Sequence, residues 1–197
     1  MNSPELQDRS RRCAWSERSA LERDYHDQEW GVPEHDDVRL FEWLILESAQ
    51  AGLSWRTILE KREGYRDAFE GFDPHRLAKR GREAEEALMQ HPGIVRNRLK
   101  IRSALNNARA FCAVQESQGS FSTFLWSFVG GVPTANVWET PADLPAQTDV
   151  SRALSQSLKA RGFSFVGPVI CYSFMQATGL VDDHIAGCYR ACPVSLK

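Results

Sequence analysis

YHDQEWG at 25–31 and DDHIAGC at 182–188 are the stretches that decide this fold, because they place metal-ligand side chains near opposite ends of the chain. Together with a cysteine that precedes them, they supply two thiols and two imidazoles: Cys13, His26, His184 and Cys188. Thiolates and imidazoles are the ligands that fill a closed tetrahedral zinc site. His184 and Cys188 stand at positions i and i+4, so a single helical turn would direct both at one ion. A metal held in this way would join the two ends of the chain.

The spacing of these four residues also fits a simpler interpretation. Neither pair matches the CxxC pattern of common zinc motifs, and a hydrogen-bonded core histidine with buried thiols would explain the same residues. Cys192 lies close to Cys188 in the sequence and is a rival ligand. The five cysteines are an odd set that fits no regular disulfide framework.

The composition of the 197-residue chain indicates a globular protein with one substantial core, or two small lobes that share a cleft. Apolar residues make up 42% of the chain and charged residues 25%, which is typical of soluble proteins. No apolar run approaches the length of a membrane span, and the polar start MNSPELQDRSRR has no secretory h-region. We therefore expect a cytoplasmic monomer with a polar tail at 1–12, one helical domain at 13–190 and a short tail at 191–197.

The formal net charge of −2 argues against tight, indiscriminate binding to nucleic acid, which usually needs an excess of basic residues. It leaves room for a local basic face. Two clusters are candidates, one with Arg96, Arg98, Lys100 and Arg102 and the other with Lys159 and Arg161. Short clusters of this kind are also typical of ordinary solvated helix faces.

Apolar residues recur at three- and four-residue steps and show no sustained alternation, which predicts an all-α chain. Ser54 is a candidate N-cap, and Asp73 followed by a proline is another. The expected helices cover about 38–51, 55–70, 82–90, 95–116, 121–129, 151–161 and 168–178, with a further helix starting at Pro74 and mostly loop at 130–147.

The turn HPGIV at 91–95 lies between two of the expected helices. Its Gly93 permits close approach of the backbone to a phosphate, and the N-terminus of the next helix would offer unpaired N–H groups to that anion. Many helix pairs share such a turn, so the pattern by itself fits both a DNA-binding hairpin and an ordinary connection.

Glu47 is the most informative acidic residue of the sequence. It lies on the stripe formed by Leu40, Trp43 and Leu44, which should face the core. A carboxylate at that position is costly unless it is paired or binds a ligand. The alternative is a glutamate at the rim of the core, whose stem packs while its carboxylate reaches water.

Five segments in fixed order resemble the bacterial 3-methyladenine DNA glycosylase I family, a zinc-containing branch of the helix-hairpin-helix superfamily. They are YHDQEWGVP (25–33), LESAQAGLSW (46–55), RGFSFVG (161–167), YSFMQATG (172–179) and DDHIAGC (182–188). The resemblance runs from about Cys13 to Cys188. It implies a helix-hairpin-helix glycosylase fold in which one structural zinc ion per chain clasps the N- and C-terminal segments. The implied zinc ligands are Cys13, His26, His184 and Cys188.

The resemblance also implies an activity. It is the hydrolysis of the N-glycosidic bond of 3-methyladenine in alkylated double-stranded DNA, after the base is flipped out, by a monofunctional enzyme that uses no Schiff-base lysine. Glu47 would then accept hydrogen bonds from the extruded base. Tyr25 and Trp55 would stack on it or hydrogen-bond to it, with Trp15 and Trp30 as walls of the pocket.

Contacts with DNA are expected from the hairpin around Gly93, and from Arg96 and Lys100 beyond it, since the family belongs to the helix-hairpin-helix superfamily. Gly52 and Leu53 follow the Glu47 helix, and an apolar residue at an exposed turn could wedge into the gap that an extruded nucleotide leaves. The same two residues also fit a helix C-cap glycine with its hydrophobic contact.

Three positions depart from the pattern of the family. Glu22 stands where an aromatic residue is common, Ser48 where a small residue such as glycine is usual, and Asp182 where asparagine is usual. The Glu22 departure supports an alternative function, in which the chain is a non-catalytic, zinc-stapled DNA-binding module of the same fold.

Overall fold

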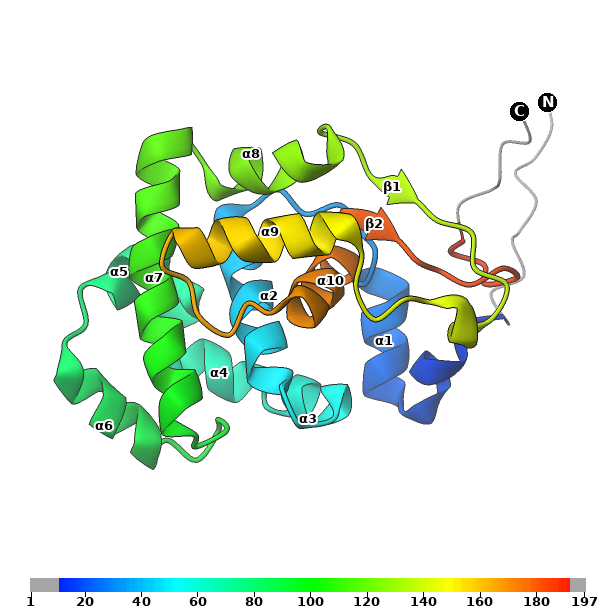
Figure 1. Ribbon diagram of the computed structural model, residues 1–197. Coiled ribbons are helices and arrows are strands. Elements are labelled where there is room, and N and C mark those ends of the chain that lie inside the picture. The colour runs from blue at the N-terminus through cyan, green and yellow to red at the C-terminus, as the bar shows by residue number, and fades with distance from the viewer. Residues whose placement is uncertain (1–10, 192–197) are drawn as a thin grey trace, which may run out of the picture.

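The computed structural model describes residues 11–191 and is mostly helical (Figure 1). With η marking a 3₁₀-helix, the helices are η1 (Ala14–Arg18), α1 (Ala20–Gln28), α2 (Asp37–Gln50), α3 (Trp55–Glu60), α4 (Arg62–Ala68), η2 (Glu70–Phe72), α5 (Pro74–Ala78), α6 (Arg82–Gln90), α7 (Arg98–Gln118), α8 (Phe121–Trp126), η3 (Ser127–Val129), η4 (Pro141–Asp143), α9 (Asp149–Ala160) and α10 (Pro168–Ala177). The strands are β1 (Thr134–Ala135) and β2 (Val181–Asp182). Within residues 11–191, no helix has the length and apolar character needed to cross a membrane.

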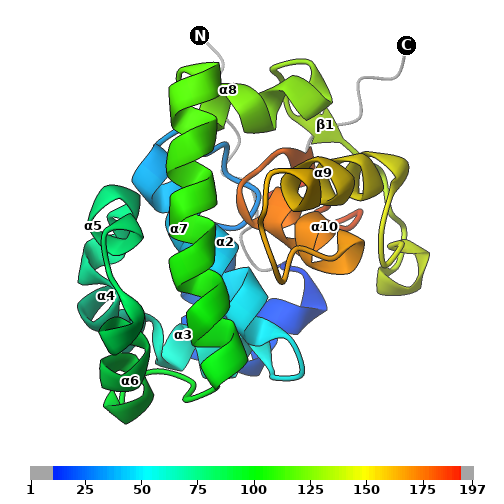
Figure 2. The ribbon, with the colours of Figure 1, turned by 60° about the vertical axis from the view of Figure 1, so that its left-hand side comes forward.

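Helix α2 is the centre of the core. Every residue from Leu40 to Ala49 is buried, including two glutamates. A helix that is buried all round must be covered by neighbours on several sides, and α2 packs against α3, α7, α8 and α10. In Figure 2, the long helix α7 lies between α4, α5 and α6 on one side and α9 and α10 on the other. This arrangement buries the α2 segment that carries Glu47 and Trp43.

Side-chain caps explain where several helices begin. Asp73 accepts hydrogen bonds from the N–H groups of His75 and Arg76, with Pro74 at the first position of α5, as predicted. Ser54 caps α3 by accepting the Thr57 N–H, also as predicted. Helix α1 was not among the predicted helices, although Ser19 and Glu22 form the Ser-x-x-Glu pattern typical of a helix start.

Two predicted helices have different boundaries in the structure. The helix expected over 55–70 is divided at Lys61 into α3 and α4. Lys61 has φ −99° and ψ 0°, and its N–H donates to the carbonyls of Ile58 and Leu59 at the end of α3. Helix α7 begins at Arg98, not at 95. Asn97 is extended, and its Oδ1 accepts the N–H groups of Leu99 and Lys100, which fixes the start of the helix.

A short parallel ladder joins two distant loops, in addition to the predicted helices. Thr134 pairs with Val181 and Ala135 with Asp182, and a single bridge links Trp138 to Ile185. Strands of two residues are too short to produce a period-2 pattern, so the all-α prediction missed them.

The ladder also overturns one local prediction. The segment after β2 is extended as far as its bridge at Ile185 and then turns at Gly187, where φ is +84°. Residues 183–191 contain no helix, and the helical turn predicted for His184 and Cys188 is therefore wrong. Pairing with β1 holds this part of the chain extended.

Candidate functional site

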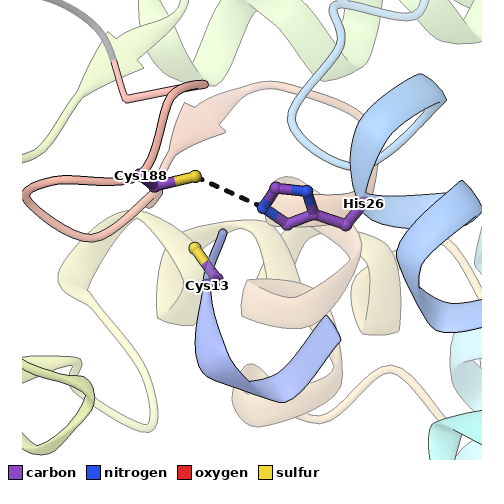
Figure 3. Close-up of side chains that lie close together, drawn as sticks. All are labelled: Cys13, His26 and Cys188. Atoms are coloured by element: carbon purple, nitrogen blue, oxygen red, sulfur yellow. Dashed lines mark hydrogen bonds between the residues drawn. The ribbon is translucent and has the colours of Figure 1, made fainter. Parts of the chain in front are cut away.

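Three side chains from distant parts of the chain converge in a buried cluster (Figure 3). Cys13 lies just before η1, His26 lies in the last turn of α1, and Cys188 lies in the turn after β2. Their ligand atoms all lie within 4.8 Å of one another, and the Cys188 sulfur is 3.4 Å from His26 Nε2. Hydrogen bonding from the Cys13 thiol and from His26 lowers the pKa of Cys188, so the pair of cysteines favours one thiolate. The cluster has the donor chemistry of a metal site.

His184 stands beside this cluster. Its ring centroid is 5.1 Å from that of His26, and its buried Nε2 has no hydrogen-bond partner among the residues that the structure describes. A buried imidazole nitrogen without a partner is costly unless a ligand occupies it. The other ring nitrogens are held by carboxylates, His184 Nδ1 at 2.6 Å from Asp182 Oδ1 and His26 Nδ1 at 2.8 Å from Asp27 Oδ1. Such contacts orient metal-binding histidines. Cys13, His26 and Cys188 therefore suit a metal, whereas the predicted fourth ligand, His184, lies beside this group of three and not within it.

The two ends of the described chain meet around this cluster. Tyr189 N–H donates to the Arg11 carbonyl at 2.9 Å, and Arg12 forms an ion pair with Asp27 at 2.8 Å. Gly31, with φ +74°, lies against the His184 ring, where a Cβ would stand 2.8 Å from His184 Cε1. A side chain at Gly31 would therefore push this imidazole out of place. The proposed rival ligand Cys192 lies outside the described residues.

A cavity of about 420 Å³ opens next to the metal cluster. The five residues predicted for base recognition all line it: Trp15, Tyr25, Trp30, Glu47 and Trp55. The rings contact one another, with Tyr25 and Trp55 centroids 5.3 Å apart and those of Trp15 and Trp30 5.2 Å apart. Trp30 also contacts the His184 ring at 4.6 Å, so one tryptophan belongs to both the cavity wall and the surroundings of the metal cluster.

Glu47 projects from α2 into this cavity and is only 5% exposed. It forms no hydrogen bond or ion pair with any of the residues 11–191. Burial raises the pKa of Glu47 to about 8, far above the usual range of a glutamate. Burial and then the charge of Glu47 also raise the pKa of Tyr25, which places the two groups close together. A buried carboxyl group without a protein partner points to a ligand as its partner.

The aromatic wall is supported from behind by an ion-pair network. The Trp43 centroid lies 5.4 Å from that of Tyr25, and the Arg62 guanidinium lies 4.3 Å from the Trp43 centroid. Arg62 in turn forms ion pairs with Glu29 and Glu42, each at 2.7 Å. The stacked guanidinium and its two carboxylates thus hold Trp43, and through it Tyr25, in place.

Asp183 is a residue of the cavity that the sequence did not single out, although it lies inside the DDHIAGC segment. It is 1% exposed, and its two oxygens accept hydrogen bonds from four side chains: Asn136, Trp138, Tyr172 and Gln176. These donors come from α10 and from the loop after β1. Asp183 therefore ties three segments together beneath the cavity and immediately precedes His184.

The predicted hairpin lies between α6 and α7 and packs on α4. A Cβ on Gly64 would stand 2.4 Å from the Gly93 carbonyl oxygen, and a Cβ on Gly93 would stand 2.8 Å from Gly64 Cα. Glycine at 93 is thus required by contact with another backbone, whatever binds outside. Gly93 N–H donates to His91 Nδ1 at 3.2 Å, and the first N–H groups of α7 are capped by Asn97. These particular N–H groups are therefore paired, contrary to the expectation of unpaired donors.

The basic residues around the hairpin differ in what they contact. Arg98 and Arg102 form ion pairs with Glu85, and Arg98 also with Glu86. Arg96 is exposed and has no ion pair within the described part of the chain. Lys100 Nζ donates to the carbonyls of Ala49 and Ala51 at 2.7 and 2.6 Å, at the C-terminal end of α2.

The turn after α2 carries the predicted wedge. Gly52 has φ +77° and nothing lies near the position of its Cβ, so glycine is needed there for the backbone conformation. Leu53 is 39% exposed and its N–H donates to the Gln50 carbonyl. Lys100, in the first turn of α7, donates hydrogen bonds to the carbonyls of Ala49 and Ala51 just before this turn, and so links α7 to it.

The chain is similar to known proteins over most of its length. The family model described as methyladenine glycosylase matches residues 15–191. The DNA-3-methyladenine glycosylase 1 of Escherichia coli K12 is 50% identical over 177 residues, which cover 90% of this chain and 95% of that protein. The DNA-3-methyladenine glycosylase of Haemophilus influenzae is 48% identical and covers 90% of this chain and 96% of its own length.

Solved structures agree with these matches. A crystal structure of 3-methyladenine DNA glycosylase I superposes with a TM-score of 0.90 at 50% identity and covers 92% of this chain and 100% of its own. The Staphylococcus aureus enzyme, studied for its recognition of 3-methyladenine, gives a TM-score of 0.87 at 41% identity and covers 90% and 94%. The family match at 15–191 includes every residue that lines the cavity as well as His26 and Cys188, and the chain therefore belongs to the methyladenine glycosylase family, with the 3-methyladenine DNA glycosylase I enzymes.

Proposed function

We propose that the enzyme excises 3-methyladenine from DNA by taking the extruded base into the cavity beside the metal cluster. Glu47 carries this proposal, because it is a buried acidic group that faces aromatic walls and has no hydrogen-bond or ion-pair partner in the described part of the chain. An extruded base needs flat rings to stack on and polar groups for its edge. The N3-alkylated base is a cation while it is attached to the sugar, so its entry would favour the ionised form of Glu47, whose pKa burial otherwise raises to about 8. Trp55 Nε1 is a buried donor without a partner at the same cavity and is a second candidate for a hydrogen bond to the base.

The reaction needs little catalytic assistance from the protein. The bond between the base nitrogen and C1′ breaks, the base keeps the electron pair and loses its positive charge, and water adds its oxygen to C1′ while releasing a proton. Alkylation already makes the base a good leaving group, so we assign no general base. Among the described residues that line the cavity there is no lysine to form a Schiff base, and Asp183 has both oxygens occupied by four donors.

We propose that the metal is zinc, held by Cys13, His26, His184 and Cys188. Two thiolates and two imidazoles suit zinc, and four protein ligands leave no position for an activated water. The ion would be structural. It would fix the segment that carries Trp15 and Tyr25 against the turn after β2, and so hold two of the cavity walls.

The decisive test is the release of free 3-methyladenine from methylated duplex DNA, measured by chromatography. Release at rates well above the spontaneous loss of the base supports the proposal. Binding to methylated DNA without release would favour the non-catalytic DNA-binding module. Single strands and free nucleosides, compared with duplex DNA, show whether the enzyme requires a nucleotide that leaves a stacked helix.

Leu53→Ala is expected to slow base release from duplex DNA while leaving the affinity for free 3-methyladenine unchanged. Leu53 is an exposed apolar side chain on the turn after α2, and a wedge matters only when a nucleotide must leave the stack. Val132→Ala, at an exposed apolar residue of the loop before β1, is the matched control. Equal losses on duplex DNA and on the free base would instead assign Leu53 to the support of the cavity.

Arg96→Ala is expected to reduce the slope of log affinity against log salt concentration by up to about one unit. The reason is that Arg96 is exposed beside the hairpin and forms no ion pair with any of the residues 11–191. Lys79→Ala, which removes one exposed positive charge at the end of α5 and belongs to neither basic cluster, should leave the slope unchanged.

Lys100 provides a second arm of this experiment. A phosphate contact by Lys100 requires its Nζ to leave the carbonyls of Ala49 and Ala51. We expect Lys100→Ala to slow release from duplex DNA through the Leu53 turn, with a smaller change of the salt slope than Arg96→Ala gives. An equal fall in slope for both variants would identify Lys100 as a direct phosphate ligand.

A further inference from the structure

Glu22 is a second buried acidic residue of the cavity, and the proposed reaction does not use it. It is 4% exposed and lines the same cavity as Glu47. Glu22 and Tyr25 stand at positions i and i+3 of α1, so their side chains share one face of the helix. The face of α1 that carries Tyr25 therefore also brings an acidic group to the cavity.

The contacts of Glu22 leave its charge without a direct counter-ion. Ser19 Oγ donates to Glu22 Oε2 at 2.8 Å and accepts the Glu22 N–H at 3.1 Å, so the residue is held by the N-cap of its own helix. No basic side chain forms an ion pair with Glu22 within the described part of the chain. Arg18 lines the cavity too, and the pKa of Arg56 is raised first by Glu60 and also by the charge of Glu22. Glu22 thus lies near enough to Arg56 of α3 to affect its pKa, and it forms no ion pair with Arg18 or Arg56.

We propose that Glu22 is a specificity-determining residue that makes the cavity prefer cationic bases. This inference rests on the proposed role of the cavity. The alkylated base is positively charged before the glycosidic bond breaks and neutral afterwards, whereas normal bases are neutral throughout. A carboxylate among apolar rings attracts a cation over several ångströms but gains little from a neutral ring. Glu22 therefore attracts the damaged base as it enters the cavity, and this attraction is lost once the bond is broken and the product is neutral.

The test compares two ligands on the whole protein by titration calorimetry at mildly alkaline pH. One is 3,9-dimethyladeninium, a permanent cation with a methyl group in place of the sugar. The other is free 3-methyladenine, which is neutral at that pH. Glu22→Gln is expected to weaken binding of the cation roughly 3- to 30-fold, and to change the affinity for the neutral base by less than about twofold.

Two control variants separate charge from structure. Glu116→Gln makes the same chemical change on an exposed part of α7 and should affect neither ligand. Ser19→Ala removes the hydroxyl contact to Glu22 and keeps the charge, so the preference for the cation should persist. Loss of both affinities in Glu22→Gln with a lowered melting temperature would show a purely structural role and overturn the inference.

The remaining outcomes are distinguishable. Unchanged binding of both ligands to Glu22→Gln would overturn the role of Glu22 while leaving the cavity as the base site. Failure of the parent protein to bind either ligand would instead overturn the proposed cavity itself.

Discussion

Cys188→Ser is expected to release the metal and to lower the free energy of unfolding by more than about 4 kcal/mol. Cys188 belongs to a cluster that joins residues 13, 26 and 188, so loss of one ligand frees three distant segments at once. The parent protein, purified without added metal, should contain about one zinc ion per chain by elemental analysis. Urea unfolding of parent and variant measures the loss of stability, and chelation of the parent should reproduce it.

Two other cysteines serve as controls. Cys171→Ser changes a buried thiol in α10, whose sulfur lies 3.4 Å from the Val166 carbonyl, and should leave the metal content unchanged. Cys192→Ser should also retain the metal; loss of metal in that variant, with retention in Cys188→Ser, would make Cys192 the ligand. A His184→Ala protein with full metal content would show that the unpartnered Nε2 of His184 has another purpose.

Glu47→Gln is expected to slow the release of 3-methyladenine about 10- to 150-fold without unfolding the protein. The loss corresponds to one charge-assisted hydrogen bond, about 1.5–3 kcal/mol, at about 1.4 kcal/mol for each factor of ten in rate. The glutamine amide keeps the shape of the side chain and still offers one acceptor, so the variant removes the charge above all. Base release from methylated duplex DNA at saturating enzyme measures the effect. A rate within about twofold of the parent would show that the base does not depend on Glu47.

The raised pKa of Glu47 also predicts how the stability of the protein depends on pH. The folded protein raises the pKa of Glu47 to about 8, so it binds this proton more tightly than the unfolded chain does. The contribution of this proton to the free energy of unfolding is therefore fully present below the ordinary pKa of glutamate, and it is lost as the pH rises through about 8. Between about pH 5 and pH 9, we expect the parent to lose roughly 2–5 kcal/mol of unfolding free energy relative to Glu47→Gln.

Urea unfolding of both proteins across this range tests the prediction, with Glu116→Gln as a control that should follow the parent. The two proteins are compared by how their free energies of unfolding change with pH, because this comparison removes the pH-independent effect of the buried amide. Parallel stability curves for the parent and Glu47→Gln would mean that the folded protein does not shift the ionisation of Glu47.

Local sequence patterns were sufficient for several features that depend on neighbouring residues, although the locally capped start of α1 was missed. The Asp73-Pro74 pair marked the start of α5, and the turn at 91–95 was placed between two helices. The apolar spacing of α2 placed Glu47 on a core-facing stripe, where it is indeed buried. Residues whose roles came from the order of five motifs, including Tyr25, Trp30 and Trp55, line one cavity.

Features that depend on distant segments were not predictable in this way. The extended path of His184 results from the pairing of β2 with β1, some 45 residues earlier, while spacing alone had suggested a helical turn. Gly93 is fixed by the backbone of Gly64, and Lys100 by two carbonyls at the end of α2. Contacts between distant segments cannot be predicted from the spacing of apolar residues, because that spacing reflects only the local structure of each segment.

The sequence by itself determined the helical class and the family, and it predicted five side chains of the cavity and the three of the buried Cys-His-Cys cluster, because these follow from local periodicity and from motifs of fixed order. Only the tertiary structure decided that Glu22 faces the same cavity, and that Glu47 and the buried His184 Nε2 have no hydrogen-bond partner among residues 11–191. Burial and missing partners are properties of how α1, α2 and the turn after β2 pack together. The pKa of Glu47 and the charge of the cavity follow from that packing.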